Sequence, residues 1–480
     1  MNGDQAVNGD QAVNTDQAVN TDQAVNTDRA VNTDRALSTD PALPRVMHVV
    51  WEYPPVIYGG LARHAEHLAR AQFQSGWEVM VVTAAEDVTD PGRRVPTGLR
   101  TRRDVQVLRV RRPLPRAPWT DLLGAARQLD QALAVAALAQ LAGPGTPMPS
   151  VVHAHDWIGA QAARTVARRI GARLVLTVHA TEYGRRQGRV GPEVDNGLPA
   201  AVHALEREGV AAADLVIVCS EAMRAEVCAV LGADPSRVRV VPNAVEVTPW
   251  RAGPASVRAA RRHWLASPPT GSVRPVATTP RSGPAGPLIA AAGRIEWEKG
   301  FSTVIRALPD LRRKHPQLRF VLAGRGSYAP ALVALAAELA VSDLLALPGW
   351  LARRDLAALY AAADVVVVPS RYEPSGLVAR EAQAAGATVI STRTGGLMEA
   401  VADGQTGLLI DTGDVYGLRD TISLLLAQPD QARRLAEAGT RAVRALTWPD
   451  VAALTTRAYS QARSASLAPA HLRSLATRSA

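Results

Sequence analysis

Two glutamates eight residues apart, Glu373 and Glu381, stand where a strand, an elbow and a helix follow one another. The short β-branched run 365–368 predicts a buried strand, and the Pro/Ser/Gly residues after it predict a turn into a helix. Parallel strands bind ligands at their carboxyl edge. Glu373 precedes the helix and Glu381 lies within it, so we expect the two carboxylates to hold different parts of one polyhydroxylated ligand. The helix should also offer free N–H groups to hydroxyl or phosphate oxygens, at Ser375, Gly376 and Leu377.

Two cations, Arg294 and Lys299, follow the predicted strand 288–292. The chain has 54 lysines and arginines, and only two are lysines, Lys299 and Lys314. Because arginine serves almost everywhere on this surface, a retained lysine indicates a need for a compact point charge. Both cations leave one strand end, so we expect them to reach a diphosphate. A surface arginine paired with a nearby glutamate is the alternative.

A glycine pair, Gly59 and Gly60, separates the first predicted strand, 46–51, from a helical pattern. Glycine lets backbone N–H groups approach an oxyanion closely, so the pair is a candidate phosphate loop. A simple turn without a ligand is the alternative interpretation.

Histidines and an aspartate stand at the ends of two later predicted strands, 151–154 and 174–179. His153 and His155 form a His-x-His pattern that could ligate a metal, but the sequence shows no third ligand and no Asp-x-Asp pair. We therefore predict no metal and no cofactor. Asp156 and His179 should lie at the carboxyl edge of the sheet, although a lone histidine is more often a satisfied core residue.

The order and spacing of these motifs resemble the retaining GT-B glycosyltransferases of family 4, which include sucrose-phosphate synthase, and the related glycogen synthases. The segments 52–55 (EYPP), 153–157 (HAHDW) and 179–185 (HATEYGR) look most like actinobacterial α-1,4-glucosyltransferases of the glycogen-synthase type. Tyr58 departs from the lysine that glycogen synthases carry before the glycine pair, and the acid at Glu381 is typical of the broader family. Both features favour family 4 as a whole over the glycogen synthases in particular.

The resemblance implies a role for each residue around the donor. Arg294 and Lys299 would neutralise the leaving nucleoside diphosphate. Glu373 would orient the sugar, Glu381 would hold the ribose, and His179 would lie beside the transferred sugar.

The remaining assignments also follow from the resemblance. Asp156 would lie on the acceptor side of the cleft. The other donor-binding candidates are backbone groups, at Gly59, Gly60, Ser375, Gly376 and Leu377.

The implied activity is metal-independent transfer of a hexose, expected to be glucose, with retention of configuration. ADP- or UDP-glucose is the expected donor, and an α-1,4-glucan is the leading acceptor. The acceptor hydroxyl would attack the face that the nucleotide leaves, and the leaving phosphate would take its proton. A small acceptor, such as an inositol, a secondary metabolite or a lipid, remains the alternative. A glycan-binding protein without catalysis is a third class, which the intact charged residues disfavour.

Composition limits the other partners. A net charge of +10 without zinc-ligand spacing or an aromatic-basic platform argues against nucleic acid, and the phosphates of a nucleotide sugar account for positive charge locally. The basic run 102–116 is interpreted as a solvated face in preference to an acceptor or membrane patch. Two cysteines, a longest apolar stretch at 133–142 and no evident signal peptide lead us to expect a cytoplasmic protein.

Strands alternating with helices predict an α/β protein of the GT-B class, with two Rossmann-like doubly wound domains facing each other across a cleft. The first strands are expected at 46–51, 78–83, 105–110, 151–154, 174–179, 215–219 and 238–241, and the second series at 288–292, 320–323, 345–347, 365–368, 388–391 and 407–410. We expect a disordered hexapeptide-repeat arm at 1–44, an acceptor-side domain at 45–250, a linker at 251–286, a nucleotide-sugar domain at 287–446, a helix at 447–465 that crosses back, and a loose tail at 466–480. A product starting at Met47 would lose no fold element.

Overall fold

The computed structural model describes residues 44–86, 95–113, 120–143, 146–266 and 286–462. All but one residue of the predicted repeat arm and the whole of the predicted tail therefore lie outside the described residues. Among the described helices, none combines the length and the apolar character that a membrane crossing requires.

The first sheet has eight strands in the order β3-β4-β2-β1-β5-β6-β7-β8, and all neighbours are parallel except β3 and β4. Its strands are β1 (Arg45–Val50), β2 (Glu78–Ala84), β3 (Gly98–Arg102), β4 (Val105–Val110), β5 (Val151–His155), β6 (Arg173–Val178), β7 (Leu215–Val218) and β8 (Val238–Val240). The helices that follow these strands are α1 (Gly60–Gln74), α2 (Leu122–Leu141), α3 (Ala160–Ile170), α4 (Glu182–Arg185), α5 (Leu198–Ala212) and α6 (Glu221–Leu231).

Both faces of this sheet are covered, as its continuous apolar strands require. On β1, Met47 and Val49 pack with α2, α3 and α6, while Val46 and Val50 pack on the opposite face with α1. Side chains of a strand alternate between faces, so one strand contributes to two cores. The sheet is therefore buried from both sides, and its carboxyl edge remains as the place for polar side chains.

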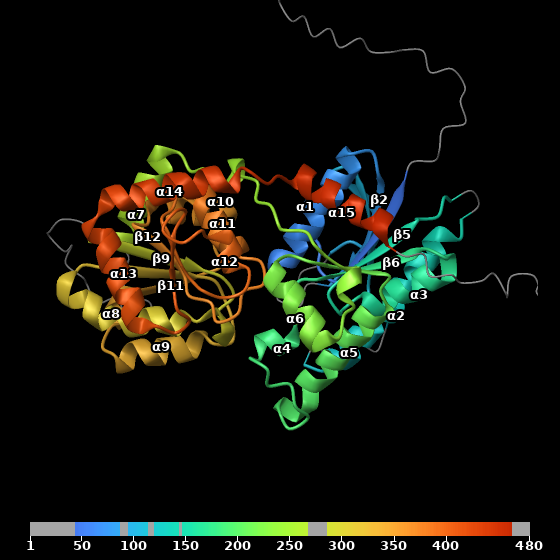
Figure 1. Cartoon of the computed structure of the whole chain (residues 1–480), viewed down its shortest axis with the longest axis horizontal. Helices are drawn as coiled ribbons and strands as arrows, with labels where there is room; N and C mark the ends of the chain where they lie inside the picture. Colours follow the sequence, from blue (N-terminus) through green and yellow to red (C-terminus); the bar gives the residue numbers. More distant parts are fainter. Residues whose placement is uncertain (1–43, 87–94, 114–119, 144–145, 267–285, 463–480) are drawn as a thin grey trace, which may run out of the picture. The chain divides into compact units, whose positions relative to one another are not determined.

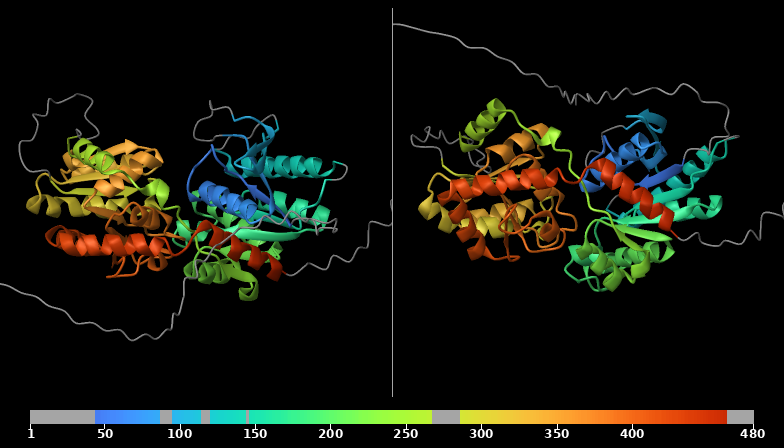
Figure 2. Two further views of the ribbon diagram at one scale, coloured as in Figure 1. Left: turned by 90° about the horizontal axis from the view of Figure 1, so that it is seen from above. Right: turned by 45° about the horizontal axis from the view of Figure 1, so that its top comes forward.

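A helix from near the end of the chain completes the second of these cores. Helix α15 (Trp448–Gln461) lies beside α1 (Figures 1 and 2), and Val451, Ala458 and Tyr459 are buried in the same cluster as Val46. It begins with a capping box between Thr447 and Asp450. The sheet domain built from 45–240 is therefore closed by residues that come more than 200 positions later.

The second sheet has six parallel strands in the order β11-β10-β9-β12-β13-β14. They are β9 (Leu288–Ala292), β10 (Arg319–Ala323), β11 (Leu345–Gly349), β12 (Val365–Val368), β13 (Val389–Thr392) and β14 (Leu408–Ile410). The accompanying helices are α7 (Pro254–Ala266), α8 (Phe301–Lys314), α9 (Ala329–Glu338), α10 (Arg353–Ala362), α11 (Leu377–Ala384), α12 (Leu397–Ala400), α13 (Val415–Ala427) and α14 (Pro429–Val443). Cores on both faces, one with α8, α9 and α13 and one with α7, α10 and α11, confirm the predicted α/β class of two parallel-sheet domains (Figure 1).

Three features differ from the sequence interpretation. The predicted linker 251–286 contains helix α7, which packs on α10 and is tied to it by Arg261, whose guanidinium donates to Ala362 O at 2.8 Å and to Asp364 at 3.0 Å. Proline and glycine around this helix hid its apolar spacing. Strand β3 was not expected, because its sequence GLRTR has no apolar alternation and its residues are largely exposed.

The third difference concerns the basic run 102–116, which we interpreted as a solvated face. Arg109 and Arg112 are buried, with exposed fractions of 7% and 5%. Arg109 donates to the carbonyl oxygens of Tyr53 and Pro54, and Arg112 pairs with Glu86 at 2.8 Å. At these two positions the charge therefore stabilises the fold, and the solvated-face interpretation is wrong for them. Residues 114–119 of the run lie outside the described part.

A glycine brings the ends of β9 and β12 together. Gly300 follows the 3₁₀ turn η4 (Trp297–Lys299) with a φ of +67°, and a Cβ at this position would overlap the carbonyl oxygen of Pro369, just after β12. The left-handed conformation and the close approach both require glycine. The turn that carries Lys299 is thereby seated on the elbow that carries Glu373.

We predict that Gly300→Ala destabilises the protein more than Gly232→Ala. Gly232 has a similar φ of +73° but nothing within 4 Å of its missing Cβ, so its substitution tests the backbone strain alone. That strain is worth about 1 kcal/mol, whereas the clash with Pro369 should raise the loss at Gly300 to about 3 kcal/mol. Urea unfolding of the two variants measures the difference. Equal losses would show that the Gly300 turn can move away from Pro369.

Candidate functional site

The most direct contact among the predicted site residues joins Lys299 and Glu373. Lys299 Nζ lies 2.8 Å from Glu373 Oε2, and the two side chains are only 16% and 9% exposed. A charge this far from water needs a partner of opposite sign. The two residues are 74 positions apart but lie at the ends of the adjacent parallel strands β9 and β12, so the sheet brings them together.

The backbone around Glu373 is held from the second sheet domain. Gly396 N donates to Glu373 O at 2.8 Å, and a Cβ on Gly395 or Gly396 would overlap the carbonyl oxygens of Glu373 or Pro374. The Thr-Gly-Gly segment after β13 therefore supports the elbow itself. Any rigid displacement of residues 395–396 would move the Glu373 carboxylate.

The neighbouring side chain of the elbow is held by the first sheet domain. Tyr372 is buried in the core that contains β5 and β6, where its OH accepts from Thr181 N at 3.0 Å and donates to Glu226 at 2.9 Å. Ser220 Oγ donates to Pro374 O at 2.7 Å. Residues 372–374 thus contact both sheet domains, and Glu373 is the residue between the two anchors.

Arg294 lies near this pair without contacting it. Its guanidinium bonds to Glu298 at 3.0 Å and is 46% exposed. This contact matches the alternative given above, a surface arginine paired with a nearby glutamate. The Arg294 guanidinium is still accessible to a ligand. The glycine turn 324–326 packs on the Arg294 loop: Ile295 N donates to Arg325 O at 2.8 Å, and a Cβ on Gly324 would overlap Gly293 O.

Glu381 lies on α11 and is partly buried. The pKa of its carboxyl is raised to about 7, mainly by burial and also by the Glu373 charge, although the charges of Arg63 on α1 and Arg353 on α10 oppose the rise. Of the other predicted groups, Leu377 is the first residue of α11, Gly376 is its N-cap and Ser375 precedes the cap. N–H groups at the start of a helix lack intrahelical acceptors. A carboxylate and free amide donors therefore flank one end of α11.

The glycine pair lies against this first turn. Gly59 and Gly60 open α1, and a Cβ on Gly60 would come 3.1 Å from Leu377 Cδ1. Gly59 has an extended φ of −166°, and a Cβ there would meet nothing within 4 Å. Neither backbone strain nor a close contact therefore requires glycine at this position. The two glycine-containing loops predicted for donor binding thus come from different sheet domains and meet.

A residue that the sequence analysis did not select, Glu52, organises the glycine loop. It is 3% exposed, directly follows β1 and accepts from Tyr58 N at 2.5 Å. Burial raises its pKa to about 7; the amides of Tyr58 and Ala62 oppose the rise, while the Asp156 charge adds to it. Its position immediately after the first parallel strand was the available signal. Segment 52–55, which carries part of the family resemblance, includes Glu52, but no role was predicted for this residue.

Asp156 and His179 are connected directly. Asp156 Oδ1 accepts from His179 N at 2.7 Å, and its own backbone has a positive φ of 59°, which aspartate tolerates better than most residues. Burial raises the pKa of Asp156 to about 6 and lowers that of His179 to about 3, with Arg185 adding to the second shift. His179 is therefore a neutral imidazole held beside a carboxylate.

His179 is also the end of a buried chain of hydrogen bonds. Its Nε2 lies 3.2 Å from His155 Nδ1, His155 Nε2 lies 3.0 Å from His48 Nδ1, and His48 Nε2 lies 2.7 Å from Gln72 Oε1. Gln72 Nε2 donates to Tyr459 OH at 3.0 Å. Beyond the tyrosine, its OH lies 2.7 Å from His153 Nδ1, and His153 Nε2 lies 2.6 Å from Thr177 Oγ1.

One amide fixes the proton positions along this chain. Because Gln72 Oε1 can only accept, His48 carries its proton on Nε2, and in neutral imidazoles each remaining Nδ1 must then accept. His155 is therefore protonated on Nε2 and His179 on Nε2. Burial lowers the pKa of His48 to about 4 and of His155 well below its usual value, so the chain stays neutral.

The structure corrects one expectation about these histidines. The sequence offered no third metal ligand beside His153 and His155, but ring nitrogens of His48, His153 and His155 all lie within 4.8 Å of one another, as do those of His64, His155 and His179. The additional histidines come from β1 and α1, more than 80 positions away. Spacing within one motif could not reveal them.

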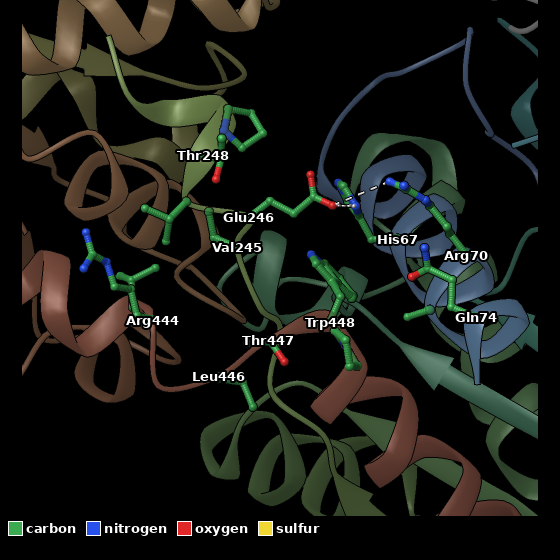
Figure 3. Close-up of a pocket in the computed structure, with 15 residues that line it drawn as sticks. His67, Arg70, Gln74, Val245, Glu246, Thr248, Arg444, Leu446, Thr447 and Trp448 are labelled. Atoms are coloured by element: carbon green, nitrogen blue, oxygen red, sulfur yellow. Dashed lines mark ion pairs between the residues drawn. The ribbon is translucent and has the colours of Figure 1, made fainter. Parts of the chain in front are cut away.

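A pocket of about 500 Å³ lies apart from the Lys299–Glu373 pair. It is lined by α1 residues, by residues 245–249 and by the segments before and at the start of α15 (Figure 3), and it contains none of the predicted site residues. His67 and Arg70 approach Glu246 at 3.3 and 4.0 Å, and His67 stacks on Trp448. The chemistry predicted from the sequence therefore does not use this pocket.

Comparison with known proteins places these features in a family. Residues 58–248 match the family described as Glycosyltransferase Family 4, and residues 281–442 match the family described as Glycosyl transferases group 1. The chain is 35% identical over 424 residues to the glycogen synthase of Mycobacterium tuberculosis, covering 87% of this chain and 95% of that protein.

Two further proteins show the breadth of the similarity. The D-inositol 3-phosphate glycosyltransferase of Xylanimonas cellulosilytica is 33% identical over 65% of this chain and 72% of its own. The structure of sucrose-phosphate synthase from Thermosynechococcus elongatus has a TM-score of 0.70 at 24% identity, covering 87% of this chain and 98% of that one. The last comparison shows a shared fold alone.

We predict that Tyr459→Phe destabilises the protein by about 2 kcal/mol, because it leaves Gln72 Nε2 and His153 Nδ1 without partners in a buried place. Tyr416→Phe is the matched control, since Tyr416 is 68% exposed and keeps its ring contact with Arg419. Thermal unfolding of both variants measures the effect. If the two melting temperatures fall equally, the buried chain does not depend on the tyrosine hydroxyl.

Proposed function

The chain belongs to the family 4 glycosyltransferases with the GT-B fold and is a nucleotide-sugar glycosyltransferase, and from this we propose that it transfers glucose from ADP- or UDP-glucose to a hydroxyl of an α-1,4-glucan, with retention. Similarity to a glycogen synthase over nearly the whole of both proteins is the observation that carries the glucan acceptor. The Lys299–Glu373 pair is the geometric feature that best supports the donor site.

The proposed donor site assigns the diphosphate to the cations. As the bond between sugar and phosphate breaks, negative charge grows on the leaving diphosphate, and preorganised cations stabilise that charge. Arg294 is exposed and able to turn toward a ligand, and Lys299 has rotatable N–H donors beyond the one that meets Glu373. The first-turn amides of α11 would supply further donors to the phosphates.

The two glutamates would bind the sugar and the ribose of the donor. Glu373, held through Tyr372 and Gly396, would accept from sugar hydroxyls, and Glu381 would accept from the ribose hydroxyls. His179, protonated on Nε2 toward His155, keeps its Nδ1 lone pair for a sugar hydroxyl or for the positive charge that develops at C1.

The proposed transfer balances without a protein nucleophile. The bond between C1 and the diphosphate oxygen breaks, and the acceptor oxygen bonds to C1 on the same face. The acceptor's proton passes to the departing phosphate oxygen, so no separate strong base is needed. The products are the extended glucan and a nucleoside diphosphate.

A small acceptor is the second candidate function. It is favoured by the 33% identity to an inositol phosphate glycosyltransferase, which covers a smaller share of this chain than the glycogen synthase does. Both candidates use the same donor site. They differ only on the acceptor side, which includes Asp156 in this proposal.

Short maltodextrins incubated with ADP- or UDP-glucose test the function, and we expect chain extension in the presence of a chelator. Lys299→Ala should lower turnover about 10²-fold to 10³-fold, because a charge-stabilising donor is removed. Lys314→Ala, at the only other lysine and on the exposed end of α8, should keep the turnover of the parent. Glucosylation of inositol phosphate without extension of maltodextrins would instead select the second candidate.

We also predict that donor affinity rises with pH through Glu381. Its pKa of about 7 means that the carboxyl is mostly protonated at pH 6 and mostly ionised at pH 8, and only the ionised form accepts two ribose hydrogen bonds. The dissociation constant of the donor should therefore fall about tenfold between these pH values. In Glu381→Gln this pH dependence should disappear. Isothermal titration measures both proteins, and an unchanged slope in the variant would remove Glu381 from the ribose site.

A further inference from the structure

One buried ring nitrogen in the histidine group has no hydrogen-bond partner. His64 is 4% exposed, its Nδ1 lies 2.7 Å from Asn243 Oδ1, and its Nε2 has no partner among the described residues. Because the amide oxygen can only accept, the proton is on Nδ1 and Nε2 presents a bare lone pair. Buried polar atoms without a partner are rare enough that each needs an explanation.

The bare nitrogen belongs to a group of three. His64, His155 and His179 each offer a ring nitrogen within 4.8 Å of the others. The proton positions fixed by Gln72 leave the Nδ1 of His155 with a lone pair that faces His179 Nε2 at 3.2 Å. Two of the three nitrogens are therefore already acceptors, and the third needs only to give up the proton that it now shares with His155.

The geometry fits a tetrahedral ion. With metal–nitrogen bonds of 2.0–2.1 Å, two ligands of a tetrahedral zinc ion are about 3.3 Å apart. The separation between His155 and His179 already has this value. His64 has a T-shaped contact with His179, with ring centroids 4.6 Å apart, so its edge is close to that pair.

The outer contacts match those of histidine ligands. A ligating histidine donates its other N–H to an acceptor that fixes its tautomer. His64 donates from Nδ1 to Asn243, and His155 donates from Nε2 to His48. By contrast, in the group His48, His153 and His155 every ring nitrogen already takes part in the hydrogen-bond chain, and no member has an unpartnered nitrogen like Nε2 of His64.

We propose that His64, His155 and His179 form a binding site for a borderline divalent transition ion such as Zn²⁺, and that the bound ion inhibits the enzyme. Imidazole ligands favour zinc, copper and nickel over magnesium or calcium. Binding through Nε2 of His179 moves the proton from that nitrogen to Nδ1 of the same ring, which stays a neutral imidazole. The inhibitory part rests on the proposed place of His179 beside the sugar, since an ion would tie this ring to His64.

Binding is tested on the full-length protein without a histidine tag, using Co²⁺ as a spectroscopic substitute and Zn²⁺ in titration calorimetry. We expect the visible absorption of tetrahedral cobalt and one zinc per chain. His64→Ala should weaken binding at least tenfold. His67→Ala, which removes a histidine one turn later on α1 that is outside the group, should leave binding unchanged.

A variant that should bind zinc more tightly is included because misfolding alone cannot produce a gain of affinity. Asn243→Asp puts a carboxylate behind His64 Nδ1, makes that ligand more basic and should tighten zinc binding about tenfold. Absence of the cobalt absorption, or equal zinc affinity in the parent and His64→Ala, would overturn the site. Zinc bound to the parent without any loss of sugar transfer would overturn the inhibitory part alone. If the parent and all the variants show no sugar transfer even when zinc is absent, the proposed function is contradicted, and the zinc-binding result still stands.

Discussion

The burial of the Glu373 carboxylate is the constraint around which the rest of the site is arranged. A carboxylate that is 9% exposed is stable as an anion only beside a cation, and Lys299 is that cation. For the two to meet, Gly300 must sit on Pro369, and Gly395 and Gly396 must lie under the elbow. Tyr372 then fixes the same elbow in the first sheet domain. Four backbone or packing requirements thus converge on one charged side chain.

The histidine chain solves a different electrostatic problem. Several imidazoles packed together would repel one another if charged, and burial keeps them neutral. Once neutral, each ring has one donor and one acceptor, so a single amide, Gln72, orders the protons from Thr177 to His179. The order leaves a lone pair on His179 Nδ1, and the Asn243 amide leaves another on His64 Nε2, for which the described residues provide no donor.

The predictable parts are those set by local pattern. Both sheets followed from apolar runs, and Lys299 and Glu373 could be selected because each lies in the loop after such a run. Glu52, His64 and Asn243 could not be selected, since their roles come from contacts between segments up to 179 positions apart. Strand β3 escaped because an edge strand needs no apolar face, and α7 because prolines and glycines masked its packing residues. The assignments of individual residues to donor and acceptor remain predictions.

The placement of α15 has a consequence for how the polypeptide is made. Ribosomes deliver a chain from its amino end, and domains fold as they emerge. Here one apolar face of the sheet built from 45–240 is covered by α1 but stays without α15 while the whole second sheet domain is synthesised, because α15 is residues 448–461. The nascent first domain therefore exposes the part of this apolar face that α15 later covers until α15 has left the exit tunnel, and exposed apolar surface of this kind makes such an intermediate prone to aggregation.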